Sequence, residues 1–101
     1  MKKNNGFTPV GETTDGKTVV DGIWYLFETH GLPLDIIFSI CQERKMIPDW
    51  ILLYKQMRFA GMEHDRVISK IEEAINDSFG KEFCGVVISR LNEIFQFKDT
   101  K

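Results

Sequence analysis

The chain has 101 residues and a mass of 11.7 kDa, and 43% of its residues are hydrophobic. This size predicts one globular domain with its own core, because chains divide into domains only well above this length. The net charge of −2 excludes the strong basic excess that gives non-specific affinity for phosphate. Its longest apolar runs are far shorter than the roughly 20 residues that span a bilayer, so we expect no membrane partner.

The amino terminus and the cysteines together indicate a cytoplasmic protein. Residues 1–3 are basic at two positions, but a polar stretch follows where a signal peptide would have an apolar one. Cys41 and Cys84 lie in apolar stretches and form no CxxC pair. This context predicts buried, reduced thiols in a reducing compartment.

Residues 1–20 are predicted to form a flexible arm. The segment is rich in glycine, threonine and asparagine, a composition that buries little apolar surface. The structured alternative is a short β-hairpin at Asp15-Gly16, a pair favoured in tight turns. An isolated hairpin is marginally stable, since it has no face to pack on.

Residues that typically start and end helices appear from residue 21 onward. Asp21 is a candidate cap for a first helix that ends before Gly31, where glycine supplies the left-handed residue of a helix end. Pro33 is expected in the first turn of a second helix, and Pro48 in the first turn of a third that runs to Gly61. A clearly amphipathic fourth helix starts near residue 64, and Gly80 separates it from a fifth.

These elements predict an all-α fold, a compact bundle of four or five short helices over residues 21–97, with a polar tail at residues 98–101. The apolar positions of the helices predict its core. The expected core residues are Trp24, Phe27, Ile40, Leu53, Met57, Ile71, Ile75, Phe83, Val87, Leu91 and Ile94.

The sequence contains none of the spacings that predict a catalytic or cofactor site. His30 and His64 lack a neighbouring ligand at the spacing of a zinc site, and the glycines are too far apart for a phosphate-binding loop. Both cysteines have apolar neighbours instead of the electropositive surroundings of a reactive thiol. We therefore predict no catalytic residue, no metal and no cofactor, and a protein that is not an enzyme.

One stretch resembles a known family. Asp21-Gly22, the run from Phe27 to Ile36 (FETHGLPLDI), the helix end at residues 40–44 and Asp49 resemble the region of alanyl-tRNA synthetases with the pattern LYDTYGFPxDLT. Ile37 stands where that family has a polar threonine. The resemblance implies a helical region that engages the tRNA acceptor stem, without the class II catalytic core, for which 101 residues leave no room. Capping at any helix junction also selects the spacing Gly-x-Pro-x-Asp.

Two functions follow as hypotheses. The first is a small protein-interaction module, an adaptor, an inhibitor or a homo-oligomer, with Trp50, Tyr54 and Arg58 as interface candidates because these residue types are the commonest anchors. The alternative is an RNA-binding module that contacts a tRNA acceptor stem. Its candidate contacts are Glu28, Asp35, Arg44, Lys45, Lys55 and Arg58.

Overall fold

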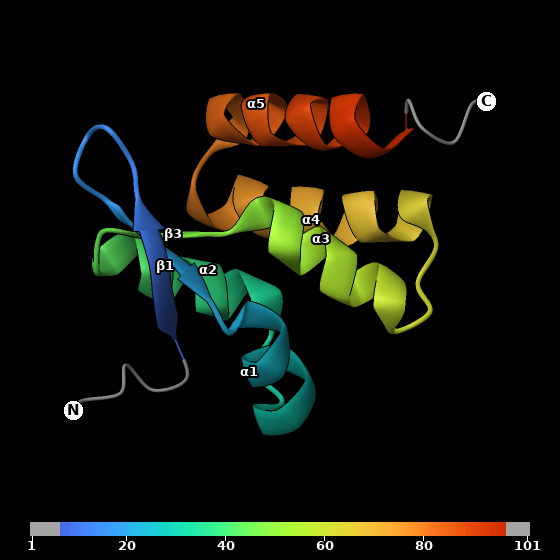
Figure 1. Ribbon diagram of the computed structural model, residues 1–101, viewed down its shortest axis with the longest axis horizontal. Helices are drawn as coiled ribbons and strands as arrows, with labels where there is room; N and C mark the ends of the chain where they lie inside the picture. The colour runs from blue at the N-terminus through green and yellow to red at the C-terminus, as the bar shows by residue number, and fades with distance from the viewer. Residues whose placement is uncertain (1–6, 97–101) are drawn as a thin grey trace.

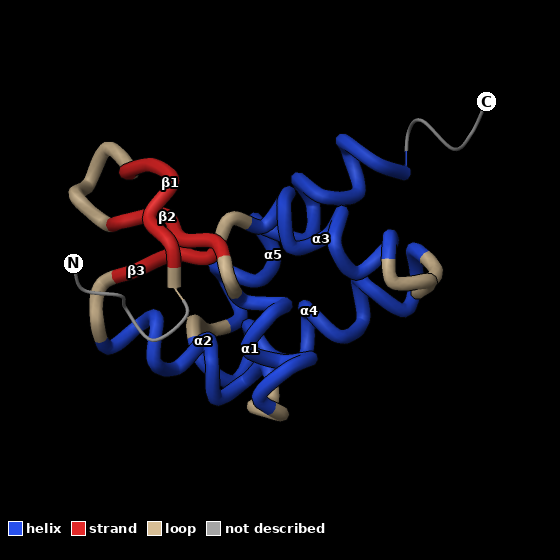
Figure 2. Tube along the Cα trace, turned by 60° about the horizontal axis from the view of Figure 1, so that its bottom comes forward, coloured by secondary structure: helices blue, strands red, loops and turns tan. Residues whose placement is uncertain are grey.

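The computed structural model describes residues 7–96, which form five α-helices, a π-helical turn and a small three-stranded sheet (Figure 1). The elements in chain order are β1 (Thr8–Glu12), β2 (Thr18–Asp21), α1 (Ile23–His30), α2 (Leu34–Glu43), β3 (Met46–Pro48), α3 (Trp50–Phe59), α4 (His64–Ser78), α5 (Lys81–Leu91) and the π-helical turn η1 (Asn92–Gln96). Helices dominate as predicted, but the sheet corrects the expectation of a purely all-α fold. Figure 2 shows the strands gathered at one end of the molecule.

The sheet includes two stretches of the segment that is predicted to be a flexible arm, Thr8–Glu12 and residues 18–20. Residues 1–6 lie outside the described part of the chain, whereas β1 and β2 form an antiparallel hairpin around Asp15-Gly16. Gly16 has φ +89°, and the Thr13 amide donates to the Lys17 carbonyl at 2.8 Å. The hairpin alternative is therefore what the structure shows. β3 pairs in parallel with β2 and supplies the third strand that a hairpin needs for stability.

β3 corrects the expected start of the third helix. Pro48 is the last residue of this strand instead of the first residue of a helix. The Lys45 carbonyl and the Asp49 amide bond to β2 at 3.2 and 2.9 Å, so the nitrogen of Pro48 faces away from the ladder. A proline is tolerated there because no ladder hydrogen bond is lost. Asp49 then caps α3 by accepting from the Leu52 amide at 3.1 Å.

The cap of the first helix also differs from the expectation. Asp21 ends β2, and Gly22, with φ +100°, is the residue that precedes α1. The chain turns sharply between strand and helix, and only glycine adopts this conformation without strain. Gly31, with φ +71°, ends α1 as predicted, and the break between α4 and α5 falls at residues 79–80.

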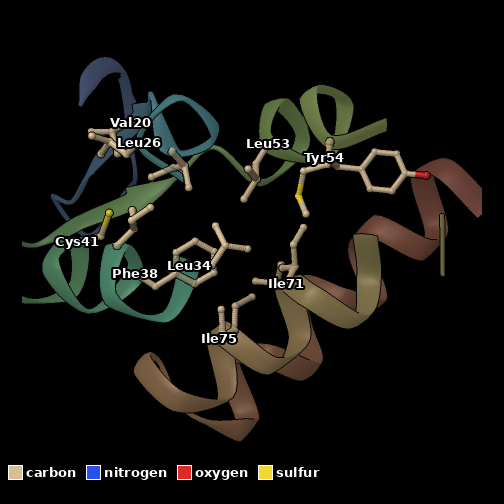
Figure 3. Close-up of a cluster of buried hydrophobic side chains, with 14 of the residues drawn as sticks. Val20, Leu26, Leu34, Phe38, Cys41, Leu53, Tyr54, Ile71 and Ile75 are labelled. Atoms are coloured by element: carbon tan, nitrogen blue, oxygen red, sulfur yellow. The ribbon is translucent and has the colours of Figure 1, made fainter. Parts of the chain in front are cut away.

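The core lies between the five α-helices and includes the inner face of the sheet (Figure 3). Six of the expected core residues are buried: Leu53, Met57, Ile71, Ile75, Val87 and Leu91. Four others, Trp24, Phe27, Ile40 and Phe83, are partly buried against it, and Ile94 is half-buried. Phe38, which was not among the expected core residues, is fully buried and is the largest such side chain.

Candidate functional site

An apolar groove of about 440 Å³ lies between the hairpin end of the sheet and α5. We call it the hairpin groove. Its lining residues come from the hairpin turn, β2, β3, the start of α3 and α5. They are Thr13, Asp15, Lys17, Val19, Ile47, Pro48, Asp49, Trp50, Ile51, Phe83, Val86, Val87, Arg90 and Leu91.

Strand register builds the floor of the hairpin groove. Val19 of β2 lies directly opposite Ile47 of β3, so both side chains stand on the same face of the sheet. Val20, the next residue, points to the opposite face and is fully buried in the core. One face of this short strand pair therefore packs in the core, and the other face lines the hairpin groove.

Trp50 joins the groove to the core. Its ring meets Phe38 edge-on, with centroids 5.3 Å apart, and lies 6.0 Å from the ring of Phe83. These contacts hold the indole in place while part of it lines the groove. Trp50 is thus the interface candidate that the structure places in a concave surface.

The rim of the groove exposes apolar side chains that the structure leaves uncovered. Val86 on α5 is 68% exposed and Ile51 on α3 is 39% exposed. α5 carries two apolar faces, because Cys84 and Leu91 point into the core while Val86 points outward. Exposed apolar residues grouped around a hollow are typical of an interaction surface.

The charged side chains around the hairpin groove differ in whether they have a hydrogen-bond or ion-pair partner within the fold. The Thr13 hydroxyl donates to Asp15, and this hydrogen bond is the main reason that the pKa of that carboxyl is lowered. Desolvation opposes this effect, and the Lys17 ammonium at 3.9 Å adds a still smaller lowering. Asp49 is engaged by the amide that it caps. Within residues 7–96 no ion pair engages Arg90, whereas Lys17 has Asp15 as its partner.

A second groove, of about 740 Å³, lies between α1 and α3 and is called the α1–α3 groove. Phe59, at the end of α3, is 94% exposed, and Tyr25 on α1 is 51% exposed. Glu28 lines the wall that α1 forms, and Lys55 lines the wall that α3 forms. The complete lining is Asp21, Gly22, Trp24, Tyr25, Glu28, Thr29, Lys55, Gln56, Phe59 and Ala60.

The other two interface candidates lie elsewhere. Tyr54 is buried; its hydroxyl lies 2.7 Å from Nδ1 of His64, and its ring stacks on Phe95 with centroids 4.0 Å apart. Figure 3 shows the Tyr54 side chain directed toward the carboxyl-terminal part of the chain. Arg58 is exposed in the last turn of α3. Trp50, Tyr54 and Arg58 therefore do not share one surface.

The RNA-contact candidates are distributed over separate regions. Glu28 and Lys55 line the α1–α3 groove, and Arg58 lies on the last turn of the same α3. Asp35 lines a different hollow together with Lys70. Arg44 and Lys45 occupy the turn between α2 and β3, where the Lys45 carbonyl bonds to the sheet.

Both cysteines are buried thiols. Burial raises the pKa of Cys41 to about 12, and burial together with the nearby Glu72 raises the pKa of Cys84. The Cys84 thiol donates to the Glu72 carbonyl at 3.6 Å. Among the described residues, no group of three His, Cys, Asp or Glu side chains could hold a metal ion.

Sequence reasoning missed the exposed apolar residues that shape both grooves. Ile51 and Val86 were absent from the interface candidates, as were Tyr25 and Phe59. A signal existed for Phe59, since Leu53 and Met57 define the buried side of α3 and Phe59 falls outside it. Nothing in the spacing of Val86 separates it from the core-facing Val87 beside it.

Comparison with protein families, curated proteins and solved structures finds no match to this chain. Within residues 7–96, no helix has the length and apolar character needed to cross a membrane.

Proposed function

We propose that this protein is a non-enzymatic interaction module that binds an apolar segment of a partner protein in the hairpin groove. The observation that carries the proposal is the exposure of Val86 and Ile51 on opposite elements of one apolar hollow. Burying such side chains under a ligand contributes about 25 cal/mol for each Å² of apolar surface removed from water. A hollow held by the packing of Trp50 also needs little reorganisation on binding.

The chemistry of the rim defines the expected ligand. Asp15 and Lys17 pair with each other, and Asp49 caps α3, so these groups are already engaged within the fold. Arg90 lies at the same groove and can form a bidentate pair with a carboxylate. The ligand that fits is an apolar peptide segment with an acidic residue beside its apolar side chains.

Selection from a random peptide library on the immobilised protein tests this proposal. We expect the selected peptides to combine large apolar residues with Asp or Glu. Val86→Asp should abolish their binding, because it puts a carboxylate into the apolar rim. Arg90→Gln should weaken acidic peptides at least about tenfold and leave neutral apolar peptides nearly unchanged.

Ile36→Asp is the matched control. Ile36 is an exposed apolar residue on α2 that lines neither groove. Selected peptides should bind this variant like the unmodified protein. Equal loss of binding in Ile36→Asp and Val86→Asp would contradict the proposed location of the site.

RNA binding stays a prediction, supported by the resemblance of residues 21–57 to the acceptor-stem region of alanyl-tRNA synthetases. A mobility-shift assay with tRNA in low salt tests it where electrostatic attraction is least screened. Changing Lys55 and Arg58 to Ala should weaken all RNAs alike, whereas changing Glu28 or Asp35 should alter the preference among acceptor stems. Absence of any shift in low salt would exclude RNA recognition by this chain.

A further inference from the structure

We propose that the α1–α3 groove binds a second copy of this chain and forms a two-fold symmetric dimer. This surface lies apart from the hairpin groove, and the two grooves have no lining residue in common. Self-association through one groove therefore leaves the other available for a partner protein.

Phe59 supplies the apolar contact of the dimer. Its ring is almost completely in water, although burying a phenylalanine side chain is among the largest apolar gains available to a protein. The ring lines the mouth of a groove whose opposite wall carries the half-exposed Tyr25. One surface thus contains both an aromatic side chain that protrudes and an aromatic-lined hollow that could receive it, which is the requirement of a self-complementary interface.

Charge selects the orientation of the second copy. Glu28 stands on the α1 wall and Lys55 on the α3 wall. A two-fold axis that runs along the groove places the α1 wall of one copy against the α3 wall of its partner. That arrangement opposes the wall that carries Glu28 to the wall that carries Lys55, so opposite charges lie on facing walls, and it likewise opposes the walls that carry Tyr25 and Phe59. An axis across the groove would instead oppose like walls and bring like charges together, which is unfavourable.

The walls that carry these residues are fixed by the fold. The Gln56 side chain on α3 donates at 3.4 Å to the carboxylate of Asp21, the last residue of β2, two residues before α1 begins. Met57 on the other side of α3 is fully buried in the core. The groove therefore exists before a second copy binds, and dimerisation orders only exposed side chains.

Sedimentation equilibrium over micromolar to millimolar concentrations measures the assembly directly. We expect a reversible monomer–dimer equilibrium, which Phe59→Ser should weaken at least about a hundredfold, because each dimer loses two buried rings. Circular dichroism should show an unchanged fold, since Phe59 makes little contact within the monomer. Ile36→Ser, which removes an exposed apolar residue outside the groove, should dimerise like the unmodified chain.

A charge exchange tests the orientation. Glu28→Lys alone and Lys55→Glu alone should each weaken the dimer, because two like-charged pairs then face each other. An equimolar mixture of these two variants should recover it, since every Glu28–Lys55 contact between the copies becomes attractive again, with the signs reversed in one of the two pairs. Both positions are exposed, so we expect each variant to keep its folded monomer, and circular dichroism checks this.

Two results would overturn the proposal. A strictly monomeric protein at millimolar concentration would exclude the dimer, and failure of the mixture to recover association would exclude the orientation. Val86→Asp distinguishes this proposal from the proposed function, because it should abolish peptide binding in the hairpin groove and leave self-association intact. Dimerisation that is lost in Val86→Asp and kept in Phe59→Ser would place the interface at the hairpin groove instead.

Discussion

Lys45 shows how much one backbone conformation matters to this fold. Among residues 7–96 it is the residue other than glycine with a positive φ, at 58°. A side chain in this left-handed region costs about 1 kcal/mol, because its Cβ approaches the following carbonyl oxygen. The turn offsets this conformational cost, because it brings the Lys45 carbonyl to the Thr18 amide and starts the pairing of β3 with β2.

Replacing this residue by glycine should therefore stabilise the protein. We expect Lys45→Gly to raise the free energy of unfolding by about 0.5–1 kcal/mol, because glycine adopts positive φ without strain. Lys45→Ala removes the same charge and keeps the strain, so it serves as the matched control. Urea denaturation of the three proteins measures the difference. A glycine variant less stable than the alanine variant would contradict this interpretation of the turn.

The buried thiol of Cys41 gives a prediction for pH. Its pKa is raised from the ordinary value to about 12 because folding removes it from water. The unfolded chain ionises this thiol first, so the contribution to stability is complete below the unfolded pKa and declines as the pH rises toward 12. Urea denaturation between pH 8 and about 11 should show this decline, and Cys41→Ala should reduce its slope. An unchanged slope would show that Cys41 is not the titrating group.

At the scale of elements, α5 has two apolar surfaces: one packs in the core, and the other forms part of the rim of the hairpin groove. Leu91 is fully buried in the core, whereas Val86 stands exposed at the rim of the hairpin groove. Leu91→Ala should lower the free energy of unfolding by about 2–5 kcal/mol, because it leaves a cavity. Val86→Ala should change it by less than about 0.5 kcal/mol, as expected for an exposed position. Similar losses in the two variants would contradict this division of the helix.

The helices were largely predictable from the sequence, and the sheet was not. Gly31 and Gly80 break the chain where the structure breaks it, since glycine at a helix end acts through its own backbone. β3 has only three residues, and its pairing joins Ile47 to Val19, which lies 28 positions earlier. No local pattern contains that information, so the sequence places Pro48 at a helix start and gives the hairpin at Asp15-Gly16 only as the alternative to a flexible arm. Trp50 was the one interface candidate found in a groove, because a large aromatic residue near a helix start serves core and surface together.

At the scale of the whole molecule, the hairpin groove joins segments from opposite ends of the sequence. Asp15 and Lys17 belong to the turn between the first two strands, whereas Val86 and Arg90 belong to the last α-helix. Figure 1 shows the hairpin and α5 approaching each other across the start of α3. The groove therefore exists only in the folded protein, and any change that separates the sheet from the helices should remove it without altering the groove residues themselves.

Because the hairpin groove exists only in the folded protein, the position of a bound peptide on the fold is the property that tests the proposed function. The Trp24→Phe variant leaves Trp50 as the remaining tryptophan, so its fluorescence reports on the hairpin groove alone. Because Trp24 lines the other groove, the unmodified protein would mix the two signals. Binding to the hairpin groove should change the emission of this variant in proportion to the occupancy of the site.

The most direct measurement is a heteronuclear NMR titration of the labelled protein with a selected apolar acidic peptide. We expect shift changes concentrated on the floor and rim of the hairpin groove, at Val19, Ile47, Ile51, Val86 and Arg90. Residues of the α1–α3 groove, Tyr25 and Phe59 among them, should keep their positions at a protein concentration below the dimer dissociation constant. Shift changes centred on Phe59, with the hairpin groove unaffected at peptide saturation, would contradict the claim that the hairpin groove is the protein-binding site.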